Sequence, residues 1–187
     1  PLLQAAPPAP ALPVIEFSSP TQPMASVLIS EPADVLSADF ANALSGQDDE
    51  FNVLGVGVSR ALFSILTDES RVHLQTLEYE LTLMQFEPTL PPSDAMVRAS
   101  HTLCGIHRTA GFIEIGDFAG ALESALVAAR RSGRTPSSLG VLSAAVQCLR
   151  TMTLRLQAHS PLSPEERIDA ERARQQLRSM LAETGND

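Results

Sequence analysis

The chain has 187 residues, of which 44% are hydrophobic and 4% aromatic, and its formal net charge is −9. This length is enough for one sizeable core, and the low aromatic content favours helices rich in Leu and Ala over a β-sandwich. The acidic balance argues against nucleic acid as a partner, because binding phosphates requires a basic patch. No apolar run approaches the roughly 20 residues of a membrane span, and no secretory signal is present. With only two cysteines as well, we expect a cytoplasmic protein.

Residues 1–50 are predicted to form a linker rich in proline and alanine. Seven of the fourteen prolines lie in residues 1–23, which favours extended, poorly ordered chain. A short helix is compatible with the pattern around residues 36–44. Because the chain begins at a proline and not at methionine, we expect it to be a segment of a longer polypeptide.

Residues 51–158 show the apolar periodicity of four helices. The first begins after Ser59 as N-cap and runs to about Gln85, and the proline-containing run EPTLPPSD ends it. Its expected inward residues are Phe63, Leu66, Ser70, Leu74, Leu77, Leu81 and Met84. The second helix starts after Ser93 or Asp94 and ends near Gly111.

The third helix is expected to follow at once, with an inward stripe from Ile115 to Ala129 and an end at Gly133. Thr135 and Pro136 then look like the N-cap and first turn of a fourth helix. Four helices with short connections predict an all-α fold, an antiparallel four-helix bundle. In residues 159–187, a capping box at Ser163 and Glu166 predicts one additional C-terminal helix.

The second helix carries the most informative histidine. Its inward stripe consists of Met96, Ala99, Leu103, Ile106 and Ala110. At about 100° per residue, His101 lies roughly 200° from both Ala99 and Leu103, so its imidazole should face water. We assign Arg98, Cys104, Gly105 and Arg108 to the same outer face, one or two turns away.

Gly105 has two interpretations. A glycine inside a helix costs about 1 kcal/mol relative to alanine, so its presence beside an exposed histidine suggests that a partner approaches the backbone there. Alternatively, it is a tolerated glycine beside an ordinary surface histidine.

These residues resemble the histidine phosphotransfer (HPt) domains of bacterial phosphorelays and chemotaxis-type kinases. The family motif reads approximately His-x-Leu-Lys-Gly, with a second glycine ten residues after the histidine. Here the matching residues are His101, Leu103, Gly105 and Gly111. The resemblance extends over about residues 59–158. Cys104 stands where the family has its lysine, which is thought to help hold the phosphoryl group.

The resemblance implies that His101 accepts a phosphoryl group and exchanges it with an aspartate of a response-regulator receiver domain, or receives it from the ATP of a kinase domain. Arg98, Cys104, Gly105 and Arg108 would then contact the phosphate or the partner, although both arginines are equally compatible with a solvated face. No cofactor is expected in this chain, because the partner would supply Mg²⁺. We expect a monomer without its own ATP site, forming a segment of a larger hybrid kinase. By analogy with resembling proteins, that kinase would govern type IV pili.

The alternative is a degenerate HPt fold that serves only as a docking or interaction module, and the missing lysine is its motivation. A metal site at His101, Cys104 and His107 is disfavoured, because three ligands over two turns match no usual spacing. His107 is expected to pack at the flank of the bundle, and His73 and His159 to be surface or loop residues.

Overall fold

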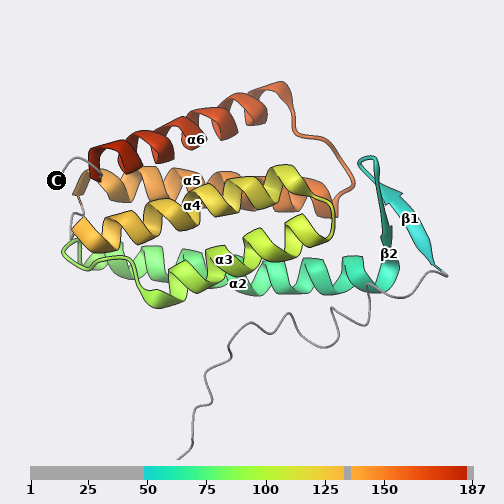
Figure 1. Cartoon of the computed structure of the whole chain (residues 1–187), viewed down its shortest axis with the longest axis horizontal. Coiled ribbons are helices and arrows are strands. Elements are labelled where there is room, and N and C mark those ends of the chain that lie inside the picture. Colours follow the sequence, from blue (N-terminus) through green and yellow to red (C-terminus); the bar gives the residue numbers. More distant parts are fainter. Residues whose placement is uncertain (1–48, 133–135, 185–187) are drawn as a thin grey trace, which may run out of the picture. The chain divides into compact units, whose positions relative to one another are not determined.

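In the computed structural model, residues 49–132 and 136–184 are described. Their elements are β1 (Glu50–Val53), β2 (Val56–Ser59), α2 (Arg60–Phe86), α3 (Asp94–Thr109), α4 (Ile113–Ser132), α5 (Pro136–Gln157) and α6 (Pro164–Thr184) (Figure 1). The predicted linker up to residue 48, the helix around residues 36–44, Gly133 and Thr135 lie outside the described residues.

The helices form a closed ring of neighbours. α2 packs against α3 and α5, α4 packs against the same two helices, and α6 lies along α4 and α5 (Figure 1). Leu and Ala side chains dominate the interior, with Phe118 its largest fully buried side chain. The predicted all-α bundle of four helices with an additional C-terminal helix is confirmed.

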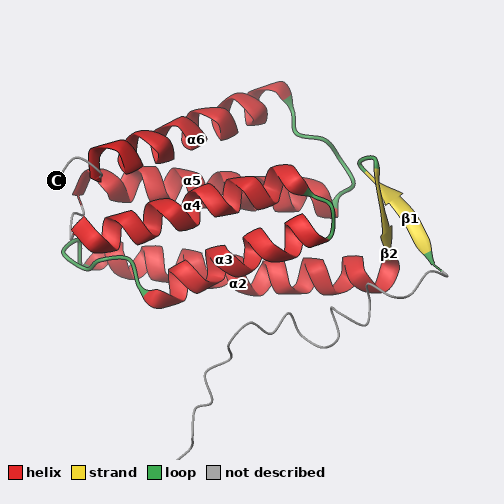
Figure 2. Cartoon of the chain, viewed as in Figure 1, coloured by secondary structure: helices red, strands yellow, loops and turns green. Residues whose placement is uncertain are grey.

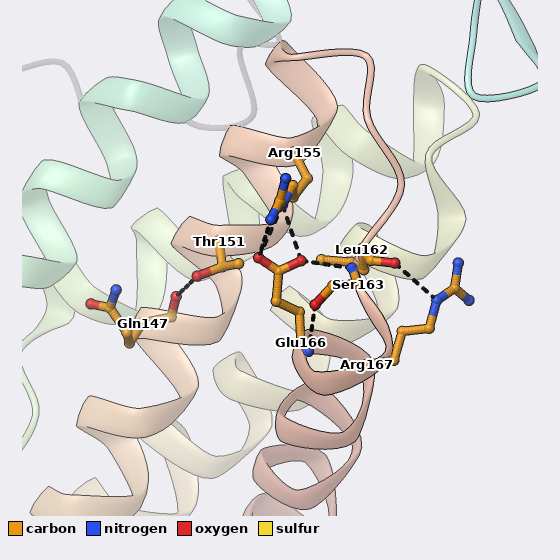
Figure 3. A network of polar contacts seen from close by, with 7 residues as sticks. All are labelled: Gln147, Thr151, Arg155, Leu162, Ser163, Glu166 and Arg167. Atoms are coloured by element: carbon orange, nitrogen blue, oxygen red, sulfur yellow. Dashed lines mark hydrogen bonds and ion pairs between the residues drawn. The ribbon is translucent and has the colours of Figure 1, made fainter.

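Hydroxyl caps fix three helix starts, as the sequence predicted. The Oγ atoms of Ser59 and Ser93 accept backbone N–H groups at 3.1 Å and 3.2 Å respectively. At α6 the capping box is complete, because Ser163 Oγ accepts the N–H of Glu166 and the carboxylate accepts the N–H of Ser163. The same carboxylate binds Arg155 of α5, so this cap also ties α6 to the bundle (Figure 3).

A two-stranded antiparallel hairpin precedes the bundle, and the sequence analysis missed it (Figure 2). Its turn residues, Leu54 and Gly55, have φ values of 53° and 91°, the left-handed region that a two-residue type I′ turn requires. The side-chain oxygen of Asn52 accepts the N–H of Gly55 at 2.9 Å. One predicted inward residue, Phe63, is only partly buried. It packs against Phe51 of the hairpin, with the ring centroids 5.4 Å apart.

Candidate functional site

His101 projects from the middle of α3 into solvent, as predicted, with 65% of its side chain exposed. Its Nδ1 lies 3.0 Å from Oε1 of Glu123 on α4. A carboxylate can only accept, so Nδ1 carries the proton and donates, and the lone pair of the neutral ring lies on Nε2. The sequence analysis did not single out Glu123, because nothing in the chain indicated which residue of α4 would lie opposite His101.

Gly105 and Arg98 share the exposed side of α3 with the histidine. A Cβ atom built at Gly105 would meet no atom within 4 Å, so the backbone is open to an approaching surface. Arg98 is exposed, and no ion pair to it occurs within residues 49–132 and 136–184. The predicted outward placement of both residues is confirmed.

The predicted outer position of Cys104 is wrong, because its side chain is buried. On the helical projection it lies about 60° from His101, and α4 covers that side of α3. Burial raises the pKa of the Cys104 thiol, and the nearby Arg108 guanidinium opposes that effect. The residue that replaces the motif lysine is therefore part of the contact between α3 and α4.

Arg108 is half-exposed and paired across the same contact. Its Nε and Nη2 both donate to Oδ1 of Asp117 on α4, at 2.9 Å and 2.7 Å. This hydrogen-bonded pair raises the pKa of the guanidinium above its usual value. The predicted outer position is confirmed, and Asp117 is its partner.

Two glycines allow α4 to lie this close to α3. A Cβ at Gly116 would stand 2.5 Å from Cγ of Arg108 and 3.0 Å from the carbonyl oxygen of Cys104. A Cβ at Gly120 would stand 3.2 Å from Sγ of Cys104. Side chains at these positions would push the two helices apart and separate His101 from Glu123.

The motif's second glycine, Gly111, ends α3 sharply. Its φ of +90° is the left-handed conformation found after helix C-caps. The N–H of Phe112 donates to the carbonyl of His107 at 2.8 Å, which closes the turn. A Cβ here would also lie 2.8 Å from Cγ1 of Val56, so the hairpin packs directly on this backbone.

His107 is fully buried and not at the flank, which corrects the prediction. Its Nδ1 lies 2.8 Å from the carbonyl oxygen of Leu103, and its Nε2 lies 3.4 Å from Oγ of Ser70 on α2. Burial lowers the pKa of His107 to about 4, so the ring is neutral near pH 7. This histidine is a core residue and is unavailable to a partner.

The remaining predictions concern metals and membranes. Within the described part of the chain, no three His, Cys, Asp or Glu side chains gather in a way that could hold a metal ion. Among the same residues, no helix combines the length and the apolar character needed to cross a membrane.

The two other histidines were predicted to be surface or loop residues. His73 pairs with Glu69 on α2, and His159 lies exposed in the turn before α6.

Comparison with known proteins places the sequence of these helices in a family. The chemotaxis protein CheA of Bacillus subtilis (strain 168) is 35% identical over 91 residues, which are 47% of this chain and 14% of that protein. The chain therefore corresponds to a small part of this relative. No solved structure shows a significant match. The model of the Hpt domain family matches residues 61–186, from the start of α2 to beyond α6. Because this match covers well over half of the chain, the protein belongs to the Hpt domain family.

Proposed function

We propose that His101 accepts a phosphoryl group on Nε2 and exchanges it with an aspartate of a receiver domain. The carrying observation is the pairing of Nδ1 with Glu123 at 3.0 Å on a side chain that is 65% exposed. A partner's phosphoryl group can approach Nε2 from solvent, whereas Nδ1 is already engaged. The phosphohistidine is therefore the Nε2 isomer.

In the forward step the Nε2 lone pair attacks phosphorus. The N–P bond forms while the P–O bond breaks to the receiver's aspartate, or to ADP when a kinase domain supplies ATP. The proton on Nδ1 stays in place, and the Glu123 carboxylate stabilises the positive charge that develops on the ring. A Mg²⁺ carried by the partner would neutralise charge on the phosphoryl oxygens. Transfer back to an aspartate is the reverse of these bond changes.

The surface around His101 suits a docked partner. Gly105 leaves the α3 backbone uncovered, and Arg98 offers a cation to phosphate or to the acidic pocket of a receiver. The likeness to a chemotaxis protein supports a kinase ATP-binding domain as the second partner. We extend this to a chemosensory pathway, of which one governing type IV pili is the case we would test first.

The test is phosphorylation of the full chain by a phosphorylated receiver, or by the kinase domain with ATP, from the same pathway. We expect acid-labile, alkali-stable label on the wild type, no label on His101→Gln, and unchanged label on the matched variant His73→Gln. Circular dichroism should show that both variants are folded. If the wild type takes no label from either donor, the protein is instead a docking module built on an HPt fold.

A further inference from the structure

The contact between α3 and α4 is built in three successive layers. Going toward the C-terminus of α3, the facing pairs are His101 with Glu123, Cys104 with Gly120, and Arg108 with Gly116. Each layer is one helical turn, about 5 Å, from the next. The first layer contains the proposed nucleophile, His101, and the third contains the Cα atom of Arg108.

The Arg108 side chain does not stay in its own layer. Its Cγ passes over Gly116, and its Nη2 stands 3.5 Å from where a Cβ of Gly120 would be. Helical side chains lean toward the N-terminus of their helix, which for α3 is the direction of His101. The guanidinium therefore lies in the second layer, one turn from the nucleophile and beside the Cys104 sulfur.

Asp117 holds the guanidinium there. Both of its hydrogen bonds run to one carboxylate oxygen, Oδ1, and use Nε and one hydrogen of Nη2. A further guanidinium N–H is hydrogen-bonded to the Cys104 sulfur. Within the described residues no other side chain takes up the guanidinium, so two of its five N–H donors are left for another acceptor. Half of the Arg108 side chain remains exposed, so an incoming phosphoryl group can reach these donors.

We propose that Arg108 supplies the cation that neutralises the phosphoryl group on His101, and that Asp117 is the positioning residue that aims it. This inference rests on the proposed function, and it explains how the site works without a lysine at position 104. Gly120 makes room for this arrangement, because the Cys104 thiol and the Arg108 guanidinium occupy the space where its side chain would be. A lysine at position 104 and the arginine would compete for one space.

Single variants test the cation directly. We expect Arg108→Gln to slow transfer to and from a receiver about ten- to thirtyfold, mainly in kcat, because a charged hydrogen bond to the transferring group is lost. Arg108→Lys should keep part of the rate. Asp117→Ala should slow transfer less than Arg108→Gln, because the guanidinium stays present but is no longer aimed.

The decisive variant is the double mutant Cys104→Lys with Arg108→Gln. If the site needs a cation, the new lysine should restore the rate lost in Arg108→Gln, whereas it should gain little in the wild-type background. A merely structural role for Arg108 predicts no such rescue. Arg150→Gln is the matched control, because Arg150 makes a comparable half-exposed pair between helices, with Glu78, away from α3.

Two results would overturn the inference. The first is wild-type kinetics in Arg108→Gln while labelling still depends on His101, which would leave the proposed function standing. The second is a loss in Arg108→Gln that Cys104→Lys does not restore. A wild type that takes no label at all would remove the proposed function together with this inference.

Discussion

At the scale of single residues, Gly105 and His107 lie two positions apart on α3 and have opposite environments. Gly105 faces open solvent one turn from His101, and His107 is enclosed between α3 and α2. Their different surroundings lead to different measurable effects, one on transfer and one on stability.

Substitution of Gly105 separates access from folding. A larger side chain meets no atom of the bundle, and leaving glycine improves helix propensity by up to about 1 kcal/mol. Gly105→Leu should therefore raise the thermal midpoint slightly while it blocks transfer from a receiver. Gly105→Ala should keep both the stability gain and most of the transfer. Wild-type transfer in Gly105→Leu would show that partners do not approach this backbone.

Acid should destabilise the protein through His107. The unfolded histidine takes up a proton near pH 6.5, whereas burial lowers the native pKa to about 4. The unfolded state thus binds more protons in this range, and the stabilisation of about 3 kcal/mol present above pH 6.5 is lost as the pH falls toward 4. Urea unfolding of wild type and His107→Leu across this range measures the difference.

A second histidine with a lowered pKa, His73, serves as the control for that experiment. The pKa of His73 is also lowered, by burial and against the opposing effect of Glu69, but His73 is present in both proteins. His107→Leu should therefore show a weaker loss of stability between pH 6.5 and 4. Parallel losses in the two proteins would contradict the assignment.

At the scale of elements, α3 and α4 form the closest helix pair of the site, and glycines set their spacing. Because Gly116 faces backbone atoms of Cys104 and Arg108, a methyl group there cannot be accommodated by a side-chain movement alone. We expect Gly116→Ala to lose about 1–3 kcal/mol from overpacking, despite its better helix propensity. Thermal unfolding beside Gly105→Ala measures this, since the same exchange on the open side of α3 should stabilise.

The elements also show which features the sequence could predict. Caps such as Ser59 and Ser163 are local, and the periodicity of one helix suffices to direct His101 outward. The burial of Cys104 depends on which side of α3 is covered by α4, and a single helical projection does not contain that information. For the same reason Glu123 and Asp117 were not found, although a pair of glycines four residues apart, Gly116 and Gly120, was a signal for close helix packing.

The hairpin was missed for a different reason. Its turn places Leu54 at a positive φ, where Asn, Asp or Gly is the usual residue. The sequence around it therefore lacks the common two-residue turn signature, although Val53, Val56 and Val58 have strand character.

At the scale of the whole described unit, the hairpin is fastened to the bundle by rings. Phe51 lies 5.4 Å from Phe63 and 5.5 Å from His159, and Phe63 also lies 6.4 Å from Phe112. These contacts join β1, α2, the start of α4 and the turn before α6. These ring contacts therefore hold the β1–β2 hairpin against the helices.

Removing the Phe51 ring should lower the stability of the protein without affecting the surface around His101. Because Phe51 is partly buried, we expect Phe51→Ala to cost about 1–3 kcal/mol in urea unfolding, without changing the labelling of His101. Phe86→Ala is the matched control, because that ring is 85% exposed and its removal should leave stability unchanged. Loss of labelling in Phe51→Ala would mean that the hairpin also shapes the site.

The pairing of the hairpin has a mechanical consequence. Glu50 pairs with Ser59 at the open end, and Val53 pairs with Val56 beside the turn. A pulling force applied at residue 49 against α2 first loads the hydrogen bonds between Asp49 and Arg60, and then these strand pairs one after another. The two strands would separate pair by pair at low force and release chain length, so the tension that reaches the bundle and the surface around His101 would stay low until the hairpin had opened.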